Sequence, residues 1–196
     1  MPNIVTIPFS DQPAINKNDS FTQSWFMFFQ DLWRAVRRNV GIKLGGTLNV
    51  DTESKSNLGN AETDLITYNL AAKSMANNGD YLEIIAWGIF ASNANNKTLK
   101  LYFGNQIIYQ TDANAANNAN WQFKAIIIRK SSNSQEICTE LLSNSSTIQN
   151  DSNYPIVRIV GNQDLSASLI VKCTGQGSAT NDLIQNTLII KLNPYN

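Results

Sequence analysis

Side chains suited to nucleophilic or acid–base chemistry are scarce in this chain of 196 residues, and histidine is missing altogether. Without histidine there is no Ser-His-Asp or Cys-His nucleophile, no histidine general base near neutral pH and no His-containing zinc site. The two cysteines, Cys138 and Cys173, are too few for a metal cluster or a disulfide framework. Cys173 shares a predicted strand face with Leu169 and Val171, so we expect a small core residue there. Cys138 falls on a more polar face, and a bridge between the two stays open.

Four carboxylates gather around one polar segment and could in principle hold calcium. They lack the regular alternation of a calcium-binding loop, so a solvated segment is the simpler interpretation. These residues are Asp51, Glu53, Glu62 and Asp64.

Two further patterns resemble parts of catalytic or phosphate-binding sites. Glu136 and Glu140 lie four apart in a predicted strand, which places both on one face roughly 13 Å apart. That separation is wide for a glycosidase pair. Gly175-Gln176-Gly177 lacks the third glycine and the following helix of a phosphate loop. We therefore predict no catalytic residue, no cofactor and no metal, and a protein that is not an enzyme.

Aromatic side chains at predicted strand positions could stack on sugar rings if they were exposed. Such positions more often place an aromatic ring in the core. The side chains concerned are Tyr68, Tyr81, Trp87, Tyr102, Tyr109 and Trp121.

The composition limits the partners that the chain is expected to have. It carries 15 basic and 15 acidic residues, and its charged fraction of 15% is well below the roughly 25% of average domains. Zero net charge favours neither nucleic acid nor an anionic membrane as a partner. A surface of amides and hydroxyls is common in assemblies and in proteins that meet carbohydrate, and a codon bias towards A and T produces it equally well. We expect no signal peptide and no membrane-spanning segment.

The elements that must position these side chains are mainly β-strands. The organising stretch is Gly79–Gly104, in which a long alternating strand is followed by a polar turn, Ser92–Lys97, and a second strand. We interpret the turn as a hairpin, and the first strand as central because both of its faces are apolar. Short spacing between strands and the lack of helical patterns predict an antiparallel β-sandwich. The predicted strands are 64–70, 80–91, 98–104, 106–111, 121–130, 134–142, 155–160, 166–174 and 187–193.

Two similar turns precede two of these strands. Ala-Asn-Asn, two spacer residues and an aromatic residue begin at Ala76 and again at Ala116. The match is too slight for a repeat array, but it suits a sandwich with internal near-symmetry. We predict exposed-loop contacts at Asn77, Asn78, Asn117 and Asn118.

The N-terminal part has a different character. Residues 1–18 are expected to form an extended arm punctuated by prolines, and Ser20–Arg38 an amphipathic helix with a capping box. The apolar area of this helix extends over two flanks, so it either docks onto its own sheet or, as we favour, associates with copies of itself or with a partner. The residues predicted for anchoring and oligomerisation are Phe21, Trp25, Phe28, Phe29, Leu32, Trp33 and Val36.

The predicted organisation is an arm and anchoring helix over residues 1–44, a linker over 45–60 and a sandwich over 61–196. The linker is inferred from Gly45-Gly46 and from the run of Asp, Ser, Asn and Gly that follows.

Two segments resemble a known class of proteins. LITYNLAAKSMANNGDYLEIIAWGIFASNANNKTLKLYFG, continuing to NNANWQFKAIIIRK, resembles a jelly-roll-like domain in small virion proteins of tailed bacteriophages, especially fibre-type proteins. SFTQSWFMFFQDLWRAV resembles the W-x-x-FF-x-x-L helix that often begins such proteins. The resemblance implies a homotrimer attached to the virion by its N-terminal part, with an outward β-domain.

The leading hypothesis is a phage structural protein, a trimeric tail fibre or spike assembled in the host cytoplasm. Its partners would be its own copies, tail or capsid proteins bound through the N-terminal region, and a host-surface glycan. We expect neither nucleic-acid binding nor membrane insertion. A capsid decoration or head fibre protein is one alternative, and a carbohydrate-binding module is another.

Overall fold

The computed structural model describes residues 25–30, 32, 45–111, 115–145 and 156–195. The chain divides into two units, Met1–Leu44 with Asn196, and Gly45–Tyr195. In the first unit the described residues form a helix over 25–30 and at 32, within the helix predicted for 20–38. The predicted arm and the anchoring residues Phe21, Trp33 and Val36 lie outside the described residues.

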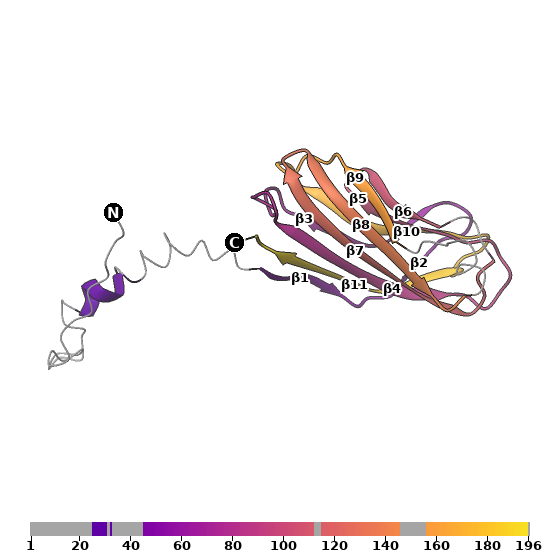
Figure 1. Ribbon diagram of the computed structural model, residues 1–196. Coiled ribbons are helices and arrows are strands. Elements are labelled where there is room, and N and C mark those ends of the chain that lie inside the picture. The colour runs from indigo at the N-terminus through magenta and orange to yellow at the C-terminus, as the bar shows by residue number, and fades with distance from the viewer. Residues whose placement is uncertain (1–24, 31, 33–44, 112–114, 146–155, 196) are drawn as a thin grey trace, which may run out of the picture. The chain divides into compact units, whose positions relative to one another are not determined.

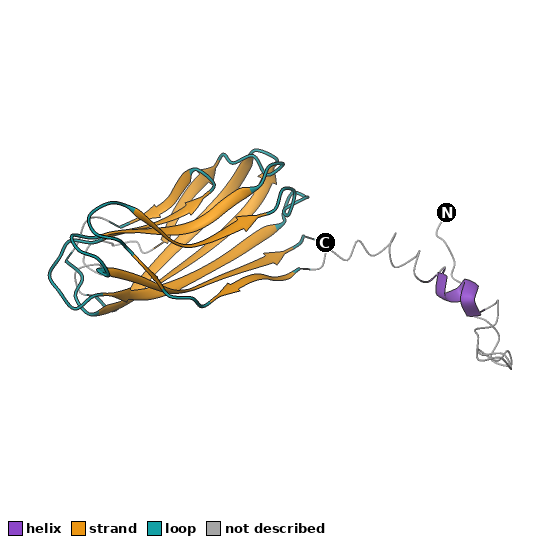
Figure 2. Ribbon diagram, turned by 180° about the vertical axis from the view of Figure 1, so that it is seen from behind, coloured by secondary structure: helices purple, strands orange, loops and turns teal. Residues whose placement is uncertain are grey.

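The second unit is built from two antiparallel sheets (Figure 1, Figure 2). The larger sheet has the order β1-β11-β4-β7-β8-β9, with the short β2 also paired to β11, and the smaller has the order β3-β10-β5-β6. The larger sheet comprises β1 (Gly46–Asp51), β2 (Lys55–Ser56), β4 (Tyr81–Phe90), β7 (Ala119–Ser131), β8 (Ser134–Ser143), β9 (Ile156–Gly161) and β11 (Leu183–Asn193); the smaller comprises β3 (Thr63–Leu70), β5 (Thr98–Phe103), β6 (Gln106–Gln110) and β10 (Leu169–Gln176).

Strand pairing follows the nested order of a jelly roll. β1 pairs with β11, β3 with β10, β4 with β7, and β5 with β6. This is the pattern of one long hairpin rolled over into two sheets. The β8–β9 hairpin is an addition that widens the larger sheet beyond β7. The predicted fold class, a mainly β protein with an antiparallel jelly-roll-like sandwich, is confirmed.

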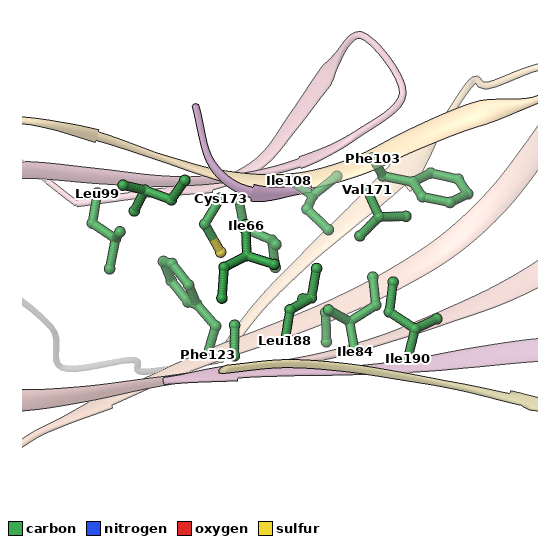
Figure 3. Packing of buried hydrophobic residues seen from close by; sticks show 14 of the residues in the cluster. Ile66, Ile84, Leu99, Phe103, Ile108, Phe123, Val171, Cys173, Leu188 and Ile190 are labelled. Carbon is green, nitrogen blue, oxygen red and sulfur yellow. The ribbon is translucent and has the colours of Figure 1, made fainter. Parts of the chain in front are cut away.

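The core lies between the two sheets, where the inward side chains of each strand meet (Figure 3). The period-2 alternation of the sequence produces it, since inward and outward side chains alternate along a strand. In β4, Leu82, Ile84 and Ala86 are buried, whereas Tyr81 and Trp87 point outward. In β7 the buried side chains are Trp121, Phe123, Ala125 and Ile127.

The segment predicted as a linker belongs to the sandwich. Residues 45–60 hold β1 and β2, both paired with β11, so the described sandwich begins at Gly45 and not at residue 61. The sequence pattern missed β1 because this edge strand has one neighbour and little burial, as Val50 at 59% exposure illustrates. An edge strand with Gly, Asn and Asp resembles a flexible joint.

The predicted hairpin within Gly79–Gly104 is wrong. β4 lies in the larger sheet, between β11 and β7, and β5 lies in the smaller, between β10 and β6. The polar turn therefore crosses between the sheets. Sequence alternation identifies strands but does not reveal which strands pair.

The sandwich has two ends, which we name by the chain's path. The near end carries Gly45 and Tyr195, where the described sandwich begins and ends, together with the β3–β4 and β7–β8 loops. The far end carries the β4–β5, β6–β7 and β10–β11 loops. Residues 1–44 join the sandwich through Gly45 and hence at its near end.

Candidate functional site

The asparagines predicted as loop contacts are all exposed, but the structure does not bring them together. Asn77 and Asn78 precede β4 at the near end, whereas Asn117 and Asn118 precede β7 at the far end. The two turns lie at opposite ends because β4 and β7 are antiparallel, with Tyr81 opposite Ile128 and Phe90 opposite Ala119. The four side chains are exposed at opposite ends of the sandwich, and contacts made by them stay a prediction.

The described anchoring residues form a small aromatic cluster. The Trp25 ring centroid lies 5.6 Å from that of Phe28 and 5.9 Å from that of Phe29. Phe29 of this cluster is 43% exposed, and the neighbouring Phe26, Met27 and Leu32 are 52%, 47% and 39% exposed.

The aromatic residues considered as sugar platforms separate into different environments. Trp121 is buried in the core. Tyr109 packs on Phe123 with ring centroids 5.1 Å apart. Trp87 and Tyr81 lie on the outer face of β4, each 37% exposed.

The carboxylates near the start of β3 are engaged in ion pairs. Glu62 accepts hydrogen bonds from Lys100 Nζ at 2.6 Å, Tyr102 Oη at 2.8 Å and Thr174 Oγ1 at 2.7 Å. Burial opposes ionisation of Glu62, but these donors outweigh it and lower its pKa to about 2. Burial and the neighbouring Glu62 raise the pKa of Tyr102 to about 12. Within the described ranges, no group of three or more acidic or cysteine side chains is placed to hold a metal ion.

The remaining chemical candidates are separated in space. Glu136 pairs with Arg158, whose Nη2 lies 2.8 Å from Oε1. Cys138 is exposed and Cys173 is buried, and both are free thiols. Burial raises the pKa of the Cys173 thiol well above its usual value, which makes it an inert core residue, as predicted.

A groove around Trp87 is the strongest candidate for a binding site. It has a volume of about 460 Å³ and crosses the outer face of the larger sheet. Adjacent strands supply one row of it, because Trp87 of β4 lies opposite Gln122 of β7, and Gln122 lies opposite Leu142 of β8. The lining side chains that matter chemically are Trp87, Asn120, Gln122, Leu142, Asn144 and Asn186.

Two of these amides are held by hydrogen bonds. Asn144 Oδ1 accepts the Asn120 backbone N–H at 2.7 Å, and Asn186 Oδ1 accepts the Ser54 hydroxyl at 3.2 Å. Asn186 lies at an irregularity in β11, between Gln185 and Thr187. A bulge of this kind redirects a side chain.

The layer beneath the groove is tightly packed. A Cβ on Gly88 would lie 1.9 Å from the Ile184 carbonyl oxygen and 2.6 Å from the Trp121 ring, so only glycine fits beside Trp87 at this point. Trp121 also contributes to the lining, and its indole N–H has no hydrogen-bond partner in the described part of the chain.

At the far end a buried lysine holds loops together by hydrogen bonds. Lys97 Nζ donates to Asn93 Oδ1 at 2.8 Å, to the Asn95 carbonyl at 2.9 Å and to the Ala116 carbonyl at 2.8 Å. Burial lowers the pKa of Lys97, and Asp182 acts in the opposite direction. The Asp182 carboxylate accepts from Asn93 Nδ2 at 2.8 Å, so the ammonium connects two loops of the far end directly and Asp182 adds the β10–β11 loop through Asn93.

Sequence analysis identified Trp87 as one of several aromatic candidates but missed the groove. Its amides come from β7, from the end of β8 and from β11, and only strand register brings them together. A weak signal was available, since outward positions of these strands carry amides where charges are more usual.

No family model and no curated protein matches this chain. Among the described residues, no helix has both the length and the apolar character needed to cross a membrane. Among solved structures, the chain is similar to the CBM2 module of the evolved Dit of Lactobacillus casei BL23 phage J-1. The two are 9% identical with a TM-score of 0.38, and the match covers 78% of this chain and 98% of that one.

Proposed function

We propose that this chain is a structural protein of a bacteriophage virion, a trimeric tail fibre or spike attached through residues 1–44. The resemblance of the segments around Trp25 and Trp87 to fibre-type virion proteins supports this role. The fold supports it as well, since a jelly roll is a stable scaffold for display. The carboxylates of Glu62, Asp64 and Glu136 are held in ion pairs with lysine or arginine side chains.

The observation that carries the proposal is the exposure of the helix's apolar side chains. Phe26, Met27, Phe29 and Leu32 remain 39–52% exposed although an aromatic cluster has formed beside them. Burying a large apolar side chain contributes roughly 1.5–3 kcal/mol. Covering this surface is therefore favoured, and in the proposed trimer two further copies of the same helix cover it.

The mass of the full chain in solution tests the trimer. Light scattering coupled to size-exclusion chromatography is expected to give three times the chain mass of 21.7 kDa. Phe29→Ser is expected to shift the protein towards monomer. Val50→Ser is the matched control, because Val50 is 59% exposed but lies on an edge strand of the sandwich. A stable monomer of the unaltered chain would remove the case for self-association.

Location on the particle separates tail from head attachment. An antibody or gold label against the jelly roll is expected to mark the tail of intact particles. Labelling around the capsid would instead identify the chain as a decoration or head fibre protein.

A carbohydrate-binding module is the second candidate function, and the groove around Trp87 favours it. A free module would bind glycans as a soluble protein and would be missing from purified particles. Immunoblotting of purified particles therefore discriminates between the two.

A further inference from the structure

We propose that the Trp87 groove binds neutral pyranose units of a glycan, with one sugar ring stacked on the Trp87 indole and its hydroxyls paired with the surrounding amides. The inference rests on the proposed display role of the sandwich, to which it adds the class of ligand. It does not depend on the trimer.

Trp87 supplies the platform. The indole is 37% exposed at an outward position of β4, which is a half-open aromatic surface and not a core ring. The face of an aromatic ring is electron-rich and attracts the polarised C–H groups on one side of a pyranose. Leu142, 49% exposed on β8, extends the apolar floor on the far side of Gln122.

The absence of charge in the groove selects the ligand. None of the described lining residues is ionisable. The next outward residue of β7, Lys124, lies 3.7 Å from Glu83 Oε1, and Lys191 shares that carboxylate at 3.5 Å. Among the described lining residues a phosphate, sulfate or sialic acid would find no cation, so neutral sugars are favoured.

Amides match the alternating donors and acceptors of sugar hydroxyls. Each Asn or Gln side chain offers a carbonyl oxygen and an NH₂ group, and the groove has such groups on β7, on β11 and directly after β8. Asn144 and Asn186 are oriented before a ligand arrives, by the bonds to Asn120 N–H and to Ser54. Pre-oriented groups lose less entropy on binding.

Size and position agree with this assignment. A volume of about 460 Å³ falls within the range of about 300–1,000 Å³ typical of small-ligand sites. The groove lies towards the far end of the larger sheet, near the start of β7 and the end of β8. The groove therefore lies towards the end of the sandwich opposite to Gly45.

Two other hollows in the described part of the sandwich lack this combination. A hollow of about 490 Å³ beside Tyr68 includes Asp64, whose carboxylate is paired with Lys172 at 2.6 Å. A hollow of about 540 Å³ beside Gln176 is lined by polar groups without an aromatic ring.

The test is binding of the full chain to an array of neutral and anionic glycans, followed by calorimetric titration with the best neutral oligosaccharide. We expect binding to neutral glycans, with an affinity that changes less than about twofold between about 50 and 500 mM salt. Trp87→Ala is expected to weaken the affinity about tenfold or more, as loss of a central aromatic contact does. No binding of any neutral glycan, or binding restricted to anionic glycans with steep salt dependence, would overturn the proposal.

A matched control is available on the same strand face. Tyr81 is as exposed as Trp87 and lies outside the groove, so Tyr81→Ala is expected to leave the affinity unchanged. Gln122→Ala keeps the test decisive if Trp87→Ala fails to fold, because Gln122 is exposed and central to the row. We expect Gln122→Ala to weaken binding about threefold or more. Equal effects of Tyr81→Ala and Trp87→Ala would contradict the assignment.

Mass measurements separate this proposal from the trimeric virion role. Loss of glycan binding in Trp87→Ala with an unchanged trimer mass supports the groove as a ligand site. A change in mass with unchanged glycan binding would show that Trp87 contacts another copy, and would sink the saccharide assignment while leaving the virion role intact. Glycan binding by a chain that is monomeric and missing from particles would support the saccharide site and overturn the virion role.

Discussion

The two ends of the sandwich are closed by different chemistry, although an Ala-Asn-Asn turn stands at each. At the near end the Asp80 carboxylate accepts the backbone N–H groups of Asn77 at 2.7 Å and Tyr195 at 2.9 Å. At the far end the buried Lys97 ammonium binds the Asn95 and Ala116 carbonyls. At the near end a carboxylate accepts hydrogen bonds from backbone N–H groups, whereas at the far end an ammonium donates hydrogen bonds to backbone carbonyls.

The two ends also differ in how many loops their hydrogen bonds join. Asp80 joins the β3–β4 loop to the last described residue, Tyr195. Lys97 joins the β4–β5 and β6–β7 loops, and Asp182 adds the β10–β11 loop through Asn93 and Asn95. The larger network lies beside the groove around Trp87. Binding sites benefit from such support, because it holds their side chains in place before a ligand arrives.

Removing the buried ammonium should give the largest effect. Lys97→Met leaves the carbonyl groups around Nζ without a donor and Asp182 without its nearby cation, and we expect the free energy of unfolding to fall by about 3–5 kcal/mol. Lys100→Met is the control three residues further along the chain, since Lys100 pairs with a partly exposed Glu62, and it should cost about 1 kcal/mol or less. Urea unfolding of both variants measures the difference. Equal losses would mean that the far end does not depend on its buried charge.

A methyl group at the near-end turn should give the next largest effect. Gly79 has a φ of 91°, and a Cβ there would lie 2.6 Å from Tyr195 Cγ. Gly79→Ala is expected to cost about 1–3 kcal/mol. Gly59→Ala is the matched variant, because Gly59 has a φ of 78° but open space around it. The amount by which Gly79→Ala exceeds Gly59→Ala in thermal or urea unfolding reports the contact with Tyr195, and no excess would argue against it.

The sequence predicted the strands well because each strand of the sandwich's interior repeats on a period of two. In β4 and β7 the inward residues are apolar and buried, and that signal needs no knowledge of the partners. It failed at β1, where one neighbour and high exposure leave little apolar pattern. The sequence pattern also failed at the β4–β5 connection. A polar turn has the same composition whether the two strands that it joins pair with each other or lie in different sheets.

The candidate site was only partly accessible from the sequence. Trp87 could be named because an aromatic residue at a strand position can stack on a sugar if it is exposed, but Asn120, Asn144 and Asn186 gain meaning only through register. Lys97 was placed in a polar turn, and nothing in its residue type reveals that it is buried. The two Ala-Asn-Asn turns suggested near-symmetry, yet the positive φ falls on Gly79 in one and on Asn118 in the other.

Acid should weaken the far end by a smaller amount. The pKa of Glu62 lies at about 2 against 4.5 for the unperturbed group. Burial disfavours the Asp182 carboxylate, but hydrogen bonds from Ala179, Asn93, Asn95 and Ser178 lower its pKa overall. A lowered pKa in the folded state contributes stability above the unfolded value, and this is lost as pH falls from about 4.5 towards 2.

Glu62→Gln tests this pH dependence. The variant should lose about 1 kcal/mol or less at neutral pH, because Glu62 is partly exposed, and its unfolding free energy should fall less steeply with acid than that of the unaltered protein. Urea unfolding at several pH values between about 5 and 2.5 measures both slopes. Identical slopes would mean that Glu62 is not among the groups that set acid stability.

The smallest effect should distinguish the two turns by its sign. Asn118 has a φ of 45°, in the left-handed region, whereas Asn78 is not among the residues with positive φ. Asn118→Gly relieves the left-handed strain and is expected to stabilise by up to about 0.5 kcal/mol. Asn78→Gly adds only freedom to the unfolded chain and should destabilise by about 0.5–1 kcal/mol. Both side chains are exposed, and the melting temperatures of the two variants measure the effect. A change of the same sign in both would mean that the two turns have the same backbone conformation. The resemblance between Ala76–Tyr81 and Ala116–Trp121 would then extend from sequence to structure.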